Sequence, residues 1–146
     1  MTRVSVSSCL VALVVGLLLV GVVSGTPIRH VLQAAPAVAL LAVRSRSRVP
    51  AWTSFAALAV FVSWLAMMSL IWLYLLGLAR IVTGHFTRIE IALTLVIGGA
   101  SAAGIVAALR ARAPSSWPLR CAAFLVAMAL QVGVTWLSVQ PAFATR

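Results

Sequence analysis

Two short stretches of the chain combine ionisable side chains of different chemical types. The first holds adjacent arginine and histidine residues, and the second, about 50 residues later, holds arginine, histidine and the only acidic residue of the sequence. Arginine supplies a permanent positive charge that binds phosphate or carboxylate groups, and histidine exchanges a proton near neutral pH. The candidate polar cluster consists of Arg29, His30, Arg80, His85, Arg88 and Glu90. If the fold brings both stretches to one end, these residues predict a site for an anion or a lipid headgroup.

The same residues also have structural explanations, to which we give more weight. Thr87 precedes Glu90 by three residues, the spacing of a capping box at a helix start. Arginines near the ends of membrane helices commonly reach the phosphates of the bilayer surface. Two histidines without a group of carboxylates or thiolates are too few for a metal or haem site. We therefore expect Glu90 to cap a helix, and we expect no metal and no other cofactor.

Signatures of catalysis are missing from the sequence. It contains no GxSxG, HExxH or Walker A motif. Cys9 and Cys121 are far apart and form no CxxC pair, so we interpret both as small apolar residues. No Asp, Glu, Lys or His falls near the middle of a predicted membrane span, where ion-coupled transporters place such groups. We predict no catalytic residues and do not expect an enzyme.

The composition sets the environment in which these residues lie. Of 146 residues, 64% are hydrophobic and 8% are charged, and the mean hydropathy is +1.18. Soluble domains average about 45–50% apolar and about 25% charged residues. The sequence therefore predicts an all-α fold, a polytopic transmembrane helical bundle that forms a single membrane domain over residues 1–146. The bilayer is its first expected partner.

The strong positive charge does not indicate a nucleic-acid partner. All 11 basic residues are arginines, and with one acid they give a net charge of +10. They lie between apolar runs, as in the loops of membrane proteins, whereas nucleic-acid binding requires a basic face. We therefore exclude nucleic acid.

Proline, glycine and capping residues predict five helices, at about 4–25, 27–43, 51–82, 88–109 and 117–139. Thr26-Pro27 is a typical helix start for the second. With about 17 residues, that helix lies at the lower limit for a membrane span. The alternative is four spans plus a short helix that does not cross. A cleaved signal peptide is the alternative for the first run, but it exceeds the ~7–15 apolar residues of a usual signal.

The arginines predict an orientation. In the five-span topology one side carries seven of them: Arg3, Arg44, Arg46, Arg48, Arg110, Arg112 and Arg120. The other side carries four: Arg29, Arg80, Arg88 and Arg146. The richer side should be cytoplasmic, so we expect the N-terminus inside and the C-terminus outside a bacterial inner membrane. The four-span alternative also divides the arginines seven to four, so charge does not distinguish the two topologies.

Small and polar residues within the spans predict helix contacts. The candidate packing residues are Gly21, Gly25, Gly98, Gly99, Gly104 and Gln131. Glycines let helix backbones approach closely, and a mid-span glutamine can form a hydrogen bond to a neighbouring helix. Such surfaces would suit other membrane proteins or a homo-oligomer.

Three functions remain at this point. The leading interpretation is a small integral membrane protein that acts as a packing or accessory component of a membrane complex. The alternative is a small oligomeric channel or transporter, with a pore lined by Gln33, Ser101 and Gln131. The third is a lipid-handling membrane enzyme that uses His85.

Overall fold

The computed structural model describes residues 5–46, 49–79, 84–111 and 116–140. All regular secondary structure in these ranges is helical. The helices are α1 Val6–Val23, α2 Pro27–Arg44, α3 Thr53–Leu75, α4 Arg88–Arg110 and α5 Trp117–Ser138. The predicted all-α class with five helices is confirmed.

Four of the helices, α1, α3, α4 and α5, are long and apolar enough to cross a membrane. Large apolar side chains remain exposed on the outside of the bundle; on α5, for example, Leu125 is 64% exposed and Trp136 is 65% exposed. Such a surface is stable against lipid rather than water. The protein is a small multi-pass membrane protein that contacts the bilayer.

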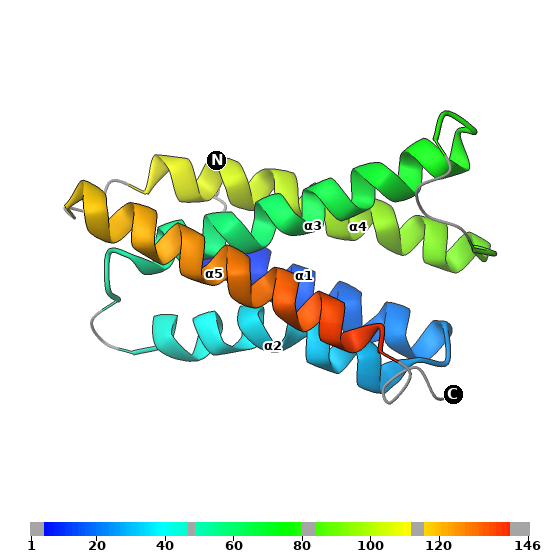
Figure 1. The fold of residues 1–146 in the computed structure, drawn as a ribbon, viewed down its shortest axis with the longest axis horizontal. Coiled ribbons are helices and arrows are strands. Elements are labelled where there is room, and N and C mark those ends of the chain that lie inside the picture. The colour runs from blue at the N-terminus through cyan, green and yellow to red at the C-terminus, as the bar shows by residue number, and fades with distance from the viewer. Residues whose placement is uncertain (1–4, 47–48, 80–83, 112–115, 141–146) are drawn as a thin grey trace.

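Consecutive helices run in opposite directions (Figure 1). α1 packs against α2 and α4, α3 packs against α4 and α5, and a contact between α2 and α5 closes the bundle. One end of the bundle contains the starts of α1, α3 and α5, and is called the Arg44 end. The opposite end contains the starts of α2 and α4, and is called the Glu90 end.

The helices α1 and α2 form a hairpin whose arms have equal length. α1 stops at a left-handed Gly25 with φ of +68°, and the Thr26 amide donates to the Gly21 carbonyl at 2.9 Å. These are the features of a Schellman turn. At the far end of the hairpin, Arg44 Nε donates to Ser7 Oγ at 3.3 Å. Because its last residue reaches the first turn of α1, α2 retraces α1 over its whole length.

Arg44 also joins this hairpin to α3. Its Nη1 donates to Thr53 Oγ1 at 2.8 Å and to Ser54 Oγ at 3.4 Å. Thr53 and Ser54 are both buried. A single guanidinium therefore connects three helices at the Arg44 end.

The helix α3 ends earlier than the sequence predicted. Gly77, the second left-handed glycine among the described residues after Gly25, has a φ of +73°. The Leu78 amide donates to the Leu73 carbonyl at 2.9 Å. These features make a Schellman turn directly after Leu75. The predicted end, Val82, lies outside the described residues.

The helix α4 begins with the predicted capping box. Thr87 Oγ1 accepts a hydrogen bond from the Glu90 amide at 3.2 Å, and Glu90 Oε2 accepts one from the Thr87 amide at 2.7 Å. Both side chains thus bond amide groups that the first turn leaves unpaired. The capping prediction for Glu90 is confirmed.

Three glycines permit the closest helix contacts. A Cβ atom added at Gly104 would lie 2.5 Å from the ring of Phe61, and one at Gly21 would lie 2.8 Å from the Cβ of His30. Gly16, which the sequence analysis did not single out, would meet Ile97 at 2.8 Å. At these positions any larger residue requires the opposing side chain or its helix to move.

The other predicted packing glycines do not make close contacts. A Cβ at Gly98 would lie 3.8 Å from Met68, an ordinary distance. Nothing lies within 4 Å of such an atom at Gly25 or Gly99. Gly25 serves the turn after α1, and Gly99 occupies an open position of α4. Within the single chain, Gly25, Gly98 and Gly99 therefore make no close helix contact, and their role in packing against another chain stays a prediction.

Candidate functional site

A partly open cavity of about 350 Å³ lies inside the bundle at the Glu90 end. All five helices contribute to its wall. Apolar side chains such as Leu17, Ile71 and Ile97 line much of it. The polar lining residues are Ser24, Thr26, Arg29, His30, Gln33, Glu90, Thr94 and Thr135. We call this space the central cavity.

Arg29 brings a positive charge to the central cavity from the first turn of α2. Its Nε atom is buried and has no hydrogen-bond partner. Within the described parts of the chain, the Arg29 guanidinium forms no ion pair. Arg29 as a whole is half-buried, so the unmet requirement is that of the single buried Nε donor, which a bound anion would satisfy.

His30, the next residue, is fixed by the turn that precedes α2. Its Nδ1 lies 3.1 Å from the Thr26 carbonyl oxygen and 3.2 Å from Thr26 Oγ1. Because a carbonyl only accepts, the first contact requires a proton on Nδ1. Thr26 occupies the N-cap position of α2, but its side chain makes no capping bond because it is engaged with His30 and Ser24.

Glu90 faces the same cavity from α4. It is half-buried, and one carboxylate oxygen is used by the capping box. Arg29 and Glu90 both act electrostatically on His30. In the part of the chain that the structure describes, Glu90 has no ion-pair partner. The cavity therefore presents a cation and an anion that do not neutralise each other directly.

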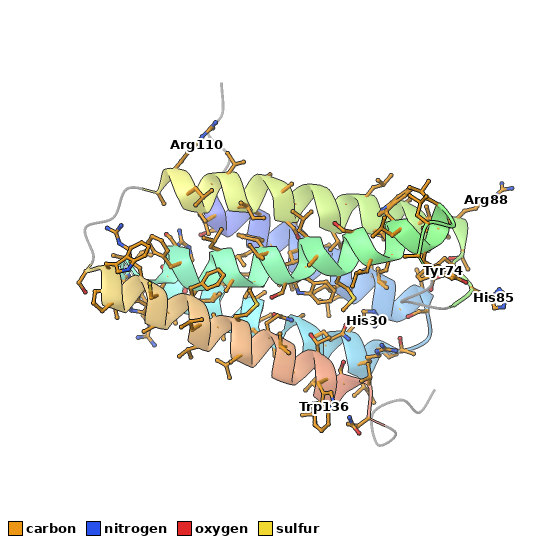
Figure 2. All side chains as sticks on the ribbon, turned by 45° about the horizontal axis from the view of Figure 1, so that its top comes forward. His30, Tyr74, His85, Arg88, Arg110 and Trp136 are labelled. Carbon is orange, nitrogen blue, oxygen red and sulfur yellow. The ribbon has the colours of Figure 1, made fainter. Side chains whose placement is uncertain are left out.

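The structure divides the predicted polar cluster. Arg29, His30 and Glu90 line the central cavity together. His85 and Arg88 are exposed, and Figure 2 shows both pointing away from the bundle at its end. Arg80 lies outside the described residues. Of the cluster members that the structure describes, only Arg29, His30 and Glu90 line one cavity and can act on one ligand there.

A buried hydrogen-bond network joins α2 to α5 through Gln33, which also lines the central cavity. Gln33 Nε2 donates to Ser138 Oγ at 2.7 Å, and Gln131 Nε2 donates to the Gln33 carbonyl at 3.3 Å. Gln33, Ser101 and Gln131 are all buried within the single chain. In this single chain, the three side chains face the interior of the bundle rather than its outer surface.

A second space, of about 440 Å³, lies between α3 and α5. We call it the α3–α5 groove; it is lined mainly by apolar side chains, including Val62, Leu70 and Val132. It shares with the central cavity the lining residues Trp64, Met67, Thr135 and Val139. The two spaces therefore adjoin along one wall.

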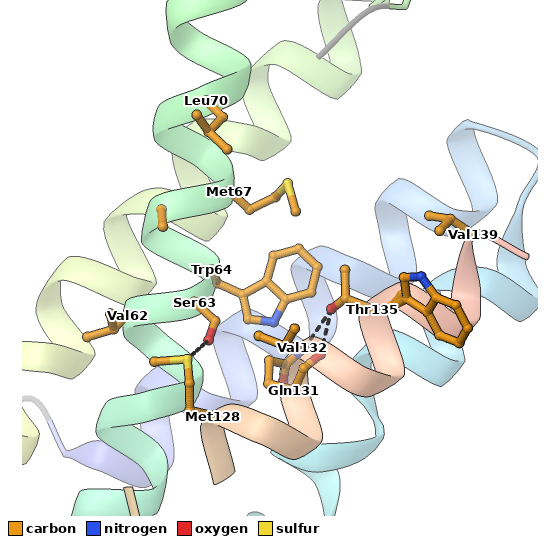
Figure 3. A pocket seen from close by; sticks show the side chains of 12 residues that line it. Val62, Ser63, Trp64, Met67, Leu70, Met128, Gln131, Val132, Thr135 and Val139 are labelled. Atoms are coloured by element: carbon orange, nitrogen blue, oxygen red, sulfur yellow. Dashed lines mark hydrogen bonds between the residues drawn. The ribbon is translucent and has the colours of Figure 1, made fainter. Parts of the chain in front are cut away.

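Trp64 occupies that shared wall. In Figure 3 its indole extends from α3 toward Thr135 and Gln131 of α5. The indole Nε1 is buried and lacks a hydrogen-bond partner among the described residues, as does Gln131 Oε1. Sequence reasoning did not select Trp64 or Thr135 as site residues. The feature of the sequence that could have marked Trp64 as a site residue is its position in mid-span, away from the bilayer surface.

Metal ligation has no support from the described residues, among which no group of three His, Cys, Asp or Glu side chains comes together. Cys9 is buried in α1 and Cys121 is half-buried in α5, each as a free thiol. Among the described residues, the groups best placed to bind a ligand are therefore the ionisable side chains of the central cavity.

No protein-family model, curated protein or solved structure matches this chain. The function must therefore be inferred from the bundle and its cavity. The arrangement combines a fixed cation, a histidine and a carboxylate around one partly open space, which suits binding of a charged ligand.

Proposed function

We propose that this chain is a small membrane protein that binds a phosphate-bearing group in the central cavity, as a non-catalytic accessory component of a membrane complex. The observation that carries the proposal is the buried, unpaired Nε of Arg29 in the cavity wall. Arginine presents a planar set of donors that matches phosphate oxygens. A bound phosphate would therefore supply the partner that the described residues do not.

We propose further that all five helices cross the membrane as a single domain over residues 1–146. Support comes from the hairpin, because α2 returns along α1 until Arg44 reaches Ser7. If α1 crosses, α2 reaches the same depth on its return. This argument favours five spans over four spans plus a non-crossing helix.

The orientation follows from the arginines. Among the described residues, the Arg44 end carries four, namely Arg44, Arg46, Arg110 and Arg120. The Glu90 end carries two, Arg29 and Arg88. The positive-inside rule therefore supports a cytoplasmic N-terminus and an outer C-terminus. With an arginine-only, alanine- and valine-rich composition, this supports a bacterial inner membrane, with the central cavity at the outer surface.

The channel and enzyme alternatives receive less support. Toward the Arg44 end from the cavity, Leu10, Leu13 and Phe61 have no exposed surface. This packed core would block the passage of a solute through a single copy of the protein, so it favours binding in the cavity over transport. His85, the candidate catalytic residue, is exposed and does not line the central cavity.

The binding proposal is tested with inorganic phosphate as the probe. Delipidated protein, whose bound phosphorus has first been shown to be gone, is heated in mild detergent with phosphate or with chloride at equal ionic strength. A ligand that binds the folded state raises the unfolding temperature with concentration. We expect phosphate to stabilise the wild type and Arg88→Gln, because Arg88 points away from the bundle. Arg29→Gln should show no phosphate-specific rise. An equal rise in Arg29→Gln, or none in the wild type, would overturn the proposal.

A further inference from the structure

We propose that the ligand of the central cavity is a phospholipid with an amine in its headgroup, whose acyl chain lies in the α3–α5 groove. This inference rests on the proposed function, because it assigns the phosphate to Arg29. It adds the side chain that binds the ammonium group, the contact to the ester region of the lipid, and the place of the lipid's acyl chain.

The charges of the cavity point to a zwitterionic headgroup. Arg29 of α2 and Glu90 of α4 line the same space without an ion pair between them. A simple anion at Arg29 would leave the Glu90 carboxylate facing another negative charge. A headgroup with both phosphate and ammonium gives each side chain an opposite charge. Glu90 Oε2 bonds the Thr87 amide, and its second oxygen can accept from an ammonium group.

The shape of the site points to an acyl chain. The central cavity and the α3–α5 groove adjoin, and their volumes of about 350 and 440 Å³ each fall within the ~300–1,000 Å³ of small-ligand sites. The helices α3 and α5 diverge toward the Glu90 end in both views (Figures 1 and 2). An apolar chain can therefore leave the cavity sideways and remain in contact with apolar side chains and the bilayer.

The order of groups along the site matches the order of groups in a glycerolipid. Arg29 and Glu90 lie in the charged part, Trp64 lies in the wall shared by both spaces, and Val132 lies in the apolar groove. A glycerolipid has a charged headgroup, then ester carbonyls, then an acyl chain. The unpaired indole N–H of Trp64 can donate to an ester carbonyl at that intermediate position.

Lipid retention tests the assignment. The protein is reconstituted into vesicles with equal amounts of phosphatidylethanolamine, phosphatidylglycerol and phosphatidylcholine, and the retained lipid is identified by native mass spectrometry. We expect phosphatidylethanolamine to be retained preferentially. Arg29→Gln should lower retention about ten- to hundredfold, the usual effect of losing a charged hydrogen bond. Glu90→Gln, which preserves a capping side chain, should shift the preference to phosphatidylglycerol. A wild-type preference for phosphatidylglycerol would overturn the amine assignment.

The groove is tested with two tryptophan substitutions on α5. Val132→Trp fills the α3–α5 groove, whereas Leu125→Trp lies on exposed α5 surface and lines neither the groove nor the central cavity. We expect only Val132→Trp to lose phospholipid, while both variants keep their stabilisation by inorganic phosphate, which also shows that they fold. Equal lipid retention in the two variants would refute the groove assignment and leave the phosphate site intact. Absence of the wild-type phosphate effect would instead refute the proposed function.

Discussion

The contact between α4 and α3 gives a quantitative test of the packing. In Gly104→Ala, the new methyl group would lie 2.5 to 2.6 Å from three ring atoms of Phe61. Ordinary contact begins near 3.4 Å, so the ring or the helix must move by roughly 1 Å. Phe61 is fully buried and cannot turn toward solvent. Overpacking of this kind costs about 1–3 kcal/mol.

Gly99→Ala is the matched control on the same helix. Nothing lies within 4 Å of a Cβ atom at Gly99. Both substitutions gain helix propensity, worth about 0.8–1 kcal/mol in a helix interior. That gain cancels in the comparison, so the difference between the two variants measures the steric cost. We expect Gly104→Ala to be less stable than Gly99→Ala by about 1–3 kcal/mol.

The assay is thermal unfolding in detergent, monitored with a thiol-reactive dye. Half-buried Cys121 is replaced by alanine in every variant, so that the dye reports the exposure of Cys9, which is buried in α1, as the bundle opens. Phe61→Leu, which shortens the opposing side chain, should recover part of the loss in Gly104→Ala, since contacting residues couple in double mutants. Equal stability of the Gly104 and Gly99 variants, or no coupling with Phe61, would refute this helix contact.

Three further predictions follow from the helix ends. Arg44→Ala should destabilise the protein by about 1.5–3 kcal/mol in thermal unfolding, because hydrogen bonds to a charged group contribute on this scale. The control Arg46→Ala should leave the stability unchanged, because Arg46 is exposed. At the start of α4, Glu90→Gln should preserve stability and Glu90→Ala should lose about 0.5–2 kcal/mol; equal losses would contradict the capping role. For the topology, alkaline phosphatase fused after Arg146 should be active and a fusion in the 44–48 loop inactive; an active loop fusion would show that α2 does not cross.

Local signals in the sequence predicted most of the helix boundaries. The Thr87–Glu90 spacing specifies a capping box through contacts within one turn, and the structure has it. Pro27 lies at the first position of α2, where its missing amide costs nothing. The end of α3 was predicted too late because a run of apolar residues continues beyond Leu75, while the turn at Gly77 depends on backbone conformation.

The candidate site was less predictable because it depends on which helices become neighbours. Periodicity does not reveal that α2 and α4 bring Arg29 and Glu90 to one cavity while His85 faces away. Gly16 and Gly99 are both glycines in apolar helices, yet only Gly16 meets a neighbouring side chain closely. Trp64 likewise lies between the central cavity and the α3–α5 groove because α5 packs against α3.

The central claim is that Arg29 holds a phosphate-bearing group inside the bundle. The most direct measurement is the phosphorus content of extensively washed protein, purified in a phosphorus-free detergent and buffer, for the wild type, Arg29→Gln and Arg88→Gln. We expect near-stoichiometric phosphorus in the wild type and in Arg88→Gln, and little in Arg29→Gln. Equal phosphorus in the wild type and Arg29→Gln would contradict the account.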